Sequence, residues 1–253
     1  MPIPEPLRSY QPSADLLAGR VIAVTGAGAG IGRAVALAAA RLGAHVILIG
    51  RNVKRLEAVH GAIAALDRQG ASIAPLDLER ALANDYDTLA AAIEERYGRL
   101  DGLLHNAAQL GVLAPIEHQD MVAWCRVLHV NLTAALALTQ VLLPALRAAA
   151  DASLIFTSSG VGRRGRANWG AYAVSKFGLE GLSQVLADEL SGNSTVRVNT
   201  LNPGAVRTTL RRQAYPGENP ESIPEPDFVV NAYLWLLGPD SRGVSGQSLN
   251  CQP

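Results

Sequence analysis

The chain has 253 residues, of which 49% are hydrophobic and 17% charged, so one large α/β domain can bury a sizeable core. Lysine and arginine number 22 and aspartate and glutamate also 22, and this zero net charge argues against nucleic acid or an anionic membrane as a partner. No apolar run approaches the roughly 20 residues that span a bilayer, and no residues have metal-ligand spacing, so we expect no membrane segment and no metal.

Short apolar segments alternate with longer helical patterns along the chain. After a Pro-rich arm we predict a strand over residues 20–26, a helix that ends at Gly43, a strand over 45–50 and a helix over 52–70. A strand over 71–78, a helix over 82–100 and a strand over 100–107 follow. A long helix from about 120 to 149, kinked at Pro144, precedes a strand over 153–159, a helix over 171–190 and a strand over 195–204. We predict a loop over 207–227, a helix over 228–238 and a last strand over 244–249.

The predicted strands are apolar on both faces, which is typical of a parallel sheet covered by helices on both sides. This pattern predicts an α/β, doubly wound fold with a single domain over residues 19–253, preceded by an N-terminal arm over 1–18. Ligands of such sheets bind at the carboxyl ends of the strands, so we expect the functional residues there.

A glycine-rich turn with Gly26, Gly28, Gly30 and Gly32 follows the first predicted strand and opens the first helix. Glycines at this place permit a tight turn and let the backbone approach a pyrophosphate at the helix N-terminus. The spacing departs from the strict G-x-G-x-x-G pattern, and close packing of helix on strand is the alternative interpretation. Its position at the start of a doubly wound domain favours dinucleotide binding.

The second predicted strand ends at Gly50-Arg51-Asn52. The carboxylate that binds the ribose 2′-hydroxyl of NAD is expected near this place, but the chain has none between Asp15 and Glu57. Arg51 can instead hold a 2′-phosphate with its planar guanidinium. The sequence therefore favours NADP(H) over NAD(H), with a solvated Arg51 as the alternative.

Tyr172 and Lys176 are four residues apart in an otherwise apolar stretch, so both side chains leave a helix on the same face. A nearby ammonium should lower the pKa of Tyr172 from about 10 toward the range of a general acid or base. The alternative is a half-buried aromatic ring beside a lysine that reaches toward solvent.

Taken together, these motifs resemble the short-chain dehydrogenase/reductase family over nearly the whole chain. The turn TGAGAGIG and the segment HNAA at 105–108 are similar to the family's cofactor turn and its Asn-Asn-Ala-Gly segment. Within the family, GRRGRANWGAYAVSKF and LWLLGPDSRGVSGQ look most like the YciK-type oxidoreductases. The resemblance implies a Rossmann fold.

By this resemblance the catalytic tetrad is Asn131, Ser159, Tyr172 and Lys176. Tyr172 would act as general acid or base, Ser159 would hold the substrate oxygen, and Lys176 would bond the nicotinamide ribose. Asn131 would fix a water that links Lys176 to solvent. The implied cofactor contacts are Thr25, Gly26, Gly28, Ala29, Gly30, Ile31, Gly32, Arg51, Asn52, Asp77, Leu78, Asn106, Ala107, Tyr172, Lys176, Pro203, Gly204, Val206 and Thr208.

Several neighbours of this tetrad are open to two interpretations. We expect Ser158 to form a local hydrogen bond at the strand end and His105 to be a hydrogen-bonded structural residue. One of Arg163, Arg164 and Arg166 could attract an acidic substrate, and a solvated basic loop or a subunit contact is the alternative.

The sequence therefore predicts an NADP-dependent oxidoreductase that transfers a hydride between NADP(H) and a small carbonyl or alcohol substrate. The alternatives are an NAD-dependent alcohol dehydrogenase of the same fold and a non-catalytic dinucleotide sensor, which needs no complete tetrad. The resemblance implies a homodimer or homotetramer, with helices around 127–146 and after Tyr172 in the dimer contact. We interpret Cys125 and Cys251 as buried hydrophobes and expect a cytoplasmic protein.

Overall fold

The computed structural model of the chain describes residues 3–66 and 70–252. The described residues leave out positions 1–2, 67–69 and 253. These positions belong to the predicted arm (1–2), to the second predicted helix (67–69) and to the predicted domain (67–69 and 253). Seven parallel strands form one sheet in the order β3-β2-β1-β4-β5-β6-β7. The strands are β1 (Val21–Thr25), β2 (His45–Gly50), β3 (Ala71–Pro75), β4 (Gly102–His105), β5 (Ala152–Thr157), β6 (Val196–Asn202) and β7 (Ser248–Asn250).

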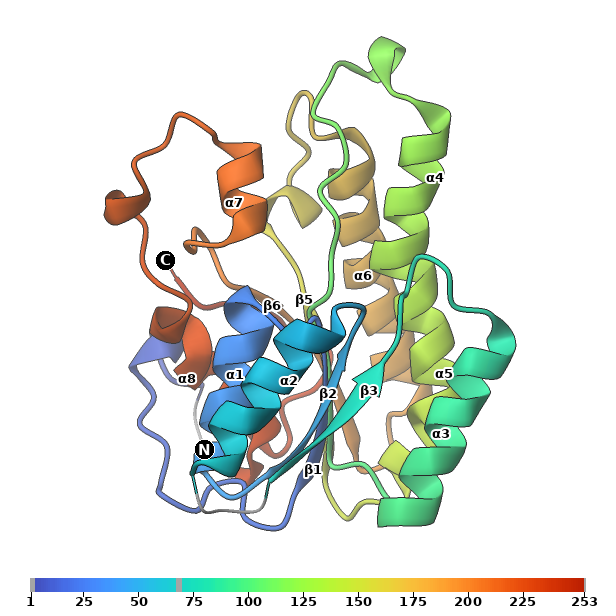
Figure 1. The fold of residues 1–253 in the computed structure, drawn as a ribbon, viewed down its shortest axis with the longest axis vertical. Coiled ribbons are helices and arrows are strands. Elements are labelled where there is room, and N and C mark those ends of the chain that lie inside the picture. Colours follow the sequence, from blue (N-terminus) through green and yellow to red (C-terminus); the bar gives the residue numbers. More distant parts are fainter. Residues whose placement is uncertain (1–2, 67–69, 253) are drawn as a thin grey trace.

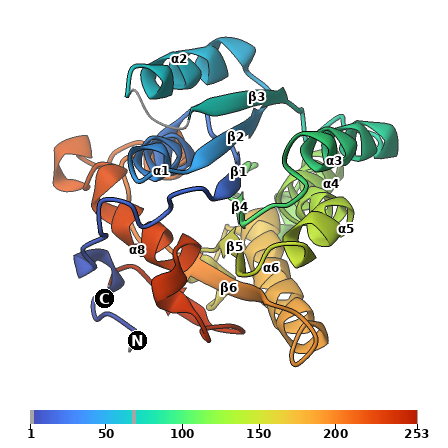
Figure 2. The same ribbon diagram turned by 90° about the horizontal axis from the view of Figure 1, so that it is seen from below.

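Helices cover both faces of this sheet, which confirms the predicted doubly wound fold (Figure 2). One face carries α1 (Gly30–Arg41), α2 (Val53–Ala64) and α8 (Asp227–Leu237). The other face carries α3 (Ala83–Tyr97), α5 (Ala134–Arg147) and α6 (Gly170–Glu189). Two further helices, α4 (Met121–Leu128) and α7 (Thr209–Ala214), lie beyond the end of the sheet at the top of Figure 1. The strand order reverses between β1 and β4, which is where such sheets bind ligands.

The described part of the N-terminal arm packs onto α8. A short 3-10 turn at Leu7–Ser9 places Leu7 and Tyr10 in the core beneath this helix. The hydroxyl of Tyr10 donates to a carboxylate oxygen of Asp240 at 2.7 Å. The arm therefore adds to the core on the face of the sheet that carries α1 and α8.

The long helix predicted from 120 to 149 is interrupted at a place different from Pro144. α4 ends at Leu128, and His129–Thr133 forms a π-helical turn before α5 begins at Ala134. A π turn inserts an extra residue into the helix and is common at functional sites. Pro144 lies inside α5, close to its end, whereas the π turn carries Asn131.

By length and composition, the stretch Met121–Arg147 could cross a membrane, since it has 27 residues and contains an 18-residue window with a mean hydropathy of 1.5. The expectation that no run approaches such a length was therefore wrong. In the fold, its apolar side packs against the sheet and against α3 and α6 through residues such as Val130, Leu138 and Leu142. A core helix meets the same criterion.

Three smaller predictions also differ from the structure. The predicted loop over 207–227 contains α7 and a 3-10 turn at Pro220–Ser222, because Thr208 caps α7 by accepting the backbone N–H of Arg211. The last strand has three residues instead of six. Cys125 is exposed, because α4 extends beyond the sheet and one side of it faces solvent, whereas Cys251 is buried as expected.

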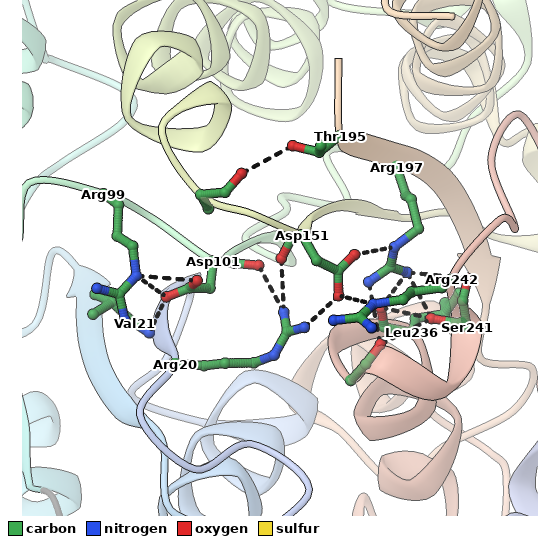
Figure 3. Close-up of polar contacts among 12 residues, drawn as sticks. Arg20, Val21, Arg99, Asp101, Asp151, Thr195, Arg197, Leu236, Ser241 and Arg242 are labelled. Carbon is green, nitrogen blue, oxygen red and sulfur yellow. Dashed lines mark hydrogen bonds and ion pairs between the residues drawn. The ribbon is translucent and has the colours of Figure 1, made fainter. Parts of the chain in front are cut away.

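Charged residues join the amino-terminal ends of the central strands, at the edge opposite the carboxyl ends (Figure 3). Asp151 precedes β5, and its Oδ1 accepts from Nε of Arg197 at 3.0 Å, while its Oδ2 pairs with Arg20. Asp101 precedes β4 and accepts the backbone N–H of Val21 at 2.8 Å. The side chains of Asp151 and Arg197 are only 9% and 6% exposed, so this is a largely buried ion-pair cluster.

Candidate active site

A cleft with a volume of about 390 Å³ opens at the carboxyl edge of the sheet. It extends from the glycine turn before α1 to α6 and is bordered by α7. The sequence-predicted residues that line it are Thr25, Gly26, Ala29, Gly30, Ile31, Arg51, Asp77, Leu78, Asn106, Ala107, Ser159, Tyr172, Lys176, Pro203, Gly204, Val206 and Thr208. The predicted residues that do not line it are Gly28, Gly32, Asn52 and Asn131.

The glycine turn brings the N-terminus of α1 close to β4. Gly26 has a φ of +68°, in the left-handed region that favours glycine. A Cβ atom at Gly32 would lie 2.5 Å from the carbonyl oxygen of Gly26, so only glycine allows this close approach. Gly32 therefore shapes the turn from beneath, while Gly26 and Gly30 face the cleft.

Thr25 fixes the turn to the neighbouring strand. Its Oγ1 accepts the backbone N–H groups of Asn106 at 2.9 Å and Ala107 at 3.0 Å. The first backbone N–H groups of α1 have no partner within their own helix, and Gly30 and Ile31 at this helix end line the cleft. This cradle fits the pyrophosphate of a dinucleotide by charge and by space.

The predicted 2′-phosphate residue, Arg51, lies at the mouth of the cleft with its side chain 63% exposed. Its guanidinium is 3.6 Å from the carboxylate of Glu79. Glu79 also accepts from Gln109 at 2.8 Å and pairs with Arg126 at 3.1 Å. The hydrogen bond from Gln109, and then the nearby arginines, lower the pKa of Glu79. Asn52 instead caps α2, where its side chain accepts the N–H of Arg55.

Sequence reasoning missed Glu79 and Gln109, although both line the cleft. Glu79 lies two residues after Asp77, so its place near a strand end was a usable signal. Gln109 follows the HNAA segment directly. Their contact with one another joins segments 30 residues apart and could not be derived from spacing.

Tyr172 and Lys176 lie on the first turns of α6 and are 6% and 2% exposed. The hydroxyl of Tyr172 forms a hydrogen bond with Ser159. The Nζ atom of Lys176 donates to the carbonyl oxygen of Thr157 at 2.6 Å and lies 5.6 Å from the centre of the Tyr172 ring. The structure thus brings three of the four tetrad residues together in the cleft.

The pKa of Tyr172 differs from the sequence expectation. Burial raises it to about 12, and the hydrogen bond with Ser159 offsets only part of this effect. The expected lowering by Lys176 was wrong. The free-energy cost of removing a phenolate from water is larger than the stabilisation that the surrounding groups give it, so the neutral phenol is favoured. Burial also lowers the pKa of Lys176 to about 8, against the charge of Glu180. Tyr172 is therefore a neutral phenol at pH 7, which suits a proton donor.

Asn131 lies behind the cleft in the π turn and is 2% exposed. Its Oδ1 accepts the N–H of Gln109 at 2.7 Å, and its Nδ2 donates to the Gln109 carbonyl and to Oγ of Ser175. Ser175 in turn donates to the carbonyl of Tyr172 at 2.7 Å. The Asn131 side chain thus fixes α6 against the segment after β4, and its predicted contact with a water stays a prediction.

Two neighbours of the tetrad have partners on other elements. Nε2 of His105 lies 2.9 Å from Oγ1 of Thr139, and burial, together with the charge of Lys176, lowers the pKa of His105 to about 3. This confirms a hydrogen-bonded structural histidine. The local bond expected for Ser158 was wrong: its hydroxyl donates to Glu180, which α6 places beside the strand end.

Sequence comparison gives the family of the chain. The profile of the short chain dehydrogenases matches residues 20–219. The oxidoreductase YciK of Escherichia coli K12 is 47% identical over 244 residues, which is 96% of each chain. The chain belongs to the short-chain dehydrogenase/reductase family. It is of the YciK type, as the sequence motifs predicted.

Solved structures of this family have the same fold at high identity. A short-chain dehydrogenase from Pseudomonas syringae is 52% identical with a TM-score of 0.95, covering 96% of this chain and 99% of its own. One from Shigella flexneri 2a, crystallised in complex with NADP, is 46% identical with a TM-score of 0.93. That comparison covers 95% of this chain and 100% of the relative.

The cleft of this short-chain dehydrogenase/reductase has an apolar wall over Tyr172. Trp169 lies 5.8 Å from the Tyr172 ring and 5.8 Å from the ring of Tyr215, which follows α7. Arg166 donates to the hydroxyl of Tyr215 at 2.5 Å, and its guanidinium lies over the rings of Trp169 and Tyr215. The wall thus joins α7 to the loop before α6. Tyr215 lies within the predicted loop over 207–227, whereas the sequence did not indicate Trp169.

Two arginine side chains of the basic loop after Ser159 contact different parts of the protein. Arg163 turns toward Glu180, with Nε 3.0 Å from its carboxylate, whereas Arg166 reaches Tyr215 at the mouth of the cleft. Among residues 3–66 and 70–252, no group of three or more His, Cys, Asp or Glu side chains could hold a metal ion.

Proposed function

We propose that this oxidoreductase transfers a hydride between NADP(H) and a small carbonyl or alcohol substrate, with Tyr172 as the general acid or base. The observation that carries the proposal is that Ser159, Tyr172 and Lys176 line the same cleft as the glycine turn. A pyrophosphate at the turn leaves the rest of the cleft for the nicotinamide and the substrate.

The protonation states favour the roles of a carbonyl reductase. Bound NADPH supplies the hydride. Ser159 and Tyr172 hold the substrate oxygen, and Tyr172 gives its proton to this oxygen as the carbonyl becomes an alcohol. The Lys176 ammonium stabilises the phenolate left behind, which then recovers a proton from solvent. Alcohol oxidation uses the same groups in the reverse direction.

The arginines at the adenosine end support NADP(H) as the cofactor. Arg51 and Arg55 both line the cleft, and Arg51 is largely exposed, so its guanidinium can turn to a 2′-phosphate. The Shigella flexneri relative was crystallised with NADP. Glu79 holds Arg51 near this place through their ion pair.

Replacing Arg51 with alanine is expected to weaken NADPH binding by about 10- to 100-fold, because a charged hydrogen bond to phosphate contributes roughly 1.5–3 kcal/mol. NADH binding should not change, since NADH has no 2′-phosphate. Fluorescence titration of both cofactors measures the two affinities.

The matched control for this change is Arg41→Ala, at the far end of α1 and away from the cleft. It should leave both affinities unchanged. Equal loss of NADPH and NADH binding in Arg51→Ala, or no loss of either, would contradict the role of Arg51 and support NAD(H).

The apolar wall supports a small substrate with an apolar body. Leu210, Ala214 and Tyr215 of the α7 region face the cleft beside Trp169. Such a wall binds hydrocarbon next to the reacting oxygen and excludes water. We further propose a cytoplasmic enzyme, in line with the reduced cysteine side chains.

We also propose that the protein is a homodimer through α5 and α6, supported by the apolar side chains that these helices expose. Leu136 on α5 and Val174, Phe177 and Val185 on α6 are 36–54% exposed. Val185→Glu is expected to halve the mass measured by light scattering, because a dimer contact would bury the new charge. Ala58→Glu, exposed on α2 at the opposite face, should keep the wild-type mass. A wild-type monomer would contradict the proposal.

A further inference from the structure

Glu180 is a buried carboxylate on α6, one helical turn after Lys176. It accepts hydrogen bonds from three hydroxyl groups, on Ser158 after β5, Thr200 in β6 and Ser248 in β7. The Thr200 bond is 2.7 Å long. The fourth donor is Nε of Arg163 at 3.0 Å, so Glu180 joins four segments of the chain.

A buried carboxylate is costly unless its oxygens have partners and its charge is balanced. Oε1 of Glu180 accepts from Ser158 and Arg163, and Oε2 accepts from Thr200 and Ser248. These bonds lower its pKa below the usual value in spite of burial, so the group is charged at neutral pH. Well-packed apolar residues in place of these five polar side chains would stabilise the fold as well, which points to a role beyond stability.

The contacts of Glu180 enclose the segment that carries Ser159. Ser158 lies directly before Ser159, and Arg163 lies four residues after it. Arg163 continues to β7, where it donates to the carbonyl of Leu249 at 2.8 Å and to Oδ1 of Asn250 at 2.6 Å. Both ends of the Ser159 segment are therefore held by one carboxylate.

Glu180 is also the carboxylate that acts on the charge of Lys176. Burial lowers the pKa of Lys176, and Glu180 raises it again. Arg163 is the charged side chain that faces Glu180 from the loop before α6, and its Nε lies 3.0 Å from the Glu180 carboxylate. The titratable groups that face Lys176 from other positions are neutral at pH 7. His105 at the end of β4 has a pKa of about 3, and burial raises the pKa of Tyr172 on α6 and of Tyr233 on α8.

We propose that Glu180 is a positioning residue for the catalytic groups. It holds the Ser159 segment in its place, and its buried negative charge keeps Lys176 protonated. The role of Glu180 in catalysis rests on the proposed function. The effect of Glu180 on the charge of Lys176 is independent of the proposed function. Loss of the carboxylate would leave an uncompensated ammonium in a buried site, which then releases its proton at lower pH.

The chain has two lysines, Lys54 and Lys176, so the charge of Lys176 can be followed directly. Protein labelled with ¹³C at lysine Cε gives two lysine signals, and exposed Lys54 serves as the internal reference. We would titrate wild type, Glu180→Gln, Glu180→Asp and Glu189→Gln by NMR. Glu189→Gln is the matched control, the same change at an exposed position of α6.

In Glu180→Gln, the titration midpoint of Lys176 is expected to fall by at least about one pH unit, while that of Lys54 stays in place. Glu180→Asp and Glu189→Gln should keep the wild-type midpoint of Lys176. A folded Glu180→Gln variant with an unchanged Lys176 midpoint overturns the proposal, and so does an equal shift in Glu189→Gln.

Turnover provides the second readout. With NADPH and a carbonyl that wild type reduces, the alkaline limb of the pH–rate profile should move to lower pH in Glu180→Gln. In Glu180→Asp this limb should stay, while kcat falls about tenfold because the shorter side chain loses hydrogen bonds to the Ser159 segment. An unchanged kcat in Glu180→Asp overturns the positioning role. This test remains available if Glu180→Gln does not fold. If wild type turns nothing over, the proposed function fails, and the NMR titration still decides the effect of Glu180 on Lys176.

Discussion

Replacing Tyr172 with phenylalanine is expected to lower kcat by about 10²- to 10⁴-fold, the usual contribution of a general acid or base. The change removes only the hydroxyl, which is the proton donor in the cleft and the partner of Ser159. The ring keeps its contacts with Trp169, so the apolar wall remains. The measurement is steady-state oxidation of NADPH with a carbonyl that the wild type reduces.

Tyr172→Phe is expected to lower turnover without weakening cofactor binding. The affinity for NADPH should stay within a few fold of wild type, because the glycine turn and Arg51 are unaffected. Tyr86→Phe is the matched control: Tyr86 lies on the buried side of α3, and its hydroxyl has no hydrogen-bond partner among the described residues. It should keep full activity. Full activity in Tyr172→Phe would remove the proposed proton donor and favour a different acid.

The second large effect is expected far from the cleft, in the ion-pair cluster of Figure 3. Asp151→Ala should lower the free energy of unfolding by about 3–5 kcal/mol, because it leaves Arg197 buried without a counter-charge. Denaturant unfolding followed by circular dichroism measures this loss. NADPH affinity of the folded fraction should not change, since the cluster lies at the opposite edge of the sheet.

The contribution of Asp151 should also depend on pH. Its pairing with Arg197 and Arg20 outweighs burial and lowers its pKa in the folded state. The stabilisation is therefore fully present above the pKa of the unfolded chain and is lost as the pH falls through the folded value. Asp87→Ala, at an exposed site on α3, is the control and should cost little at any pH. Equal losses in the two variants would show that the cluster does not stabilise the fold.

The fold and the order of the site residues followed from local patterns. Buried strands such as β1 and β2 are short apolar runs, and their alternation with helices leaves a parallel sheet as the stable arrangement. The glycine turn and the Tyr172–Lys176 spacing are also local, since each depends on residues within one or two helical turns. For this reason the sequence by itself determined the fold class, the cofactor turn and three residues that meet in the cleft.

The tertiary structure decided what depends on partners distant in sequence. Burial, and not Lys176, sets the pKa of Tyr172, and burial depends on the wall that Trp169 and Tyr215 build over it. Neither Glu180 nor Glu79 has its partners nearby in the chain. The π turn at Asn131 likewise reflects packing against α6. Spacing predicts which face of an element a side chain occupies, whereas desolvation and charge pairing arise only when separate elements pack together.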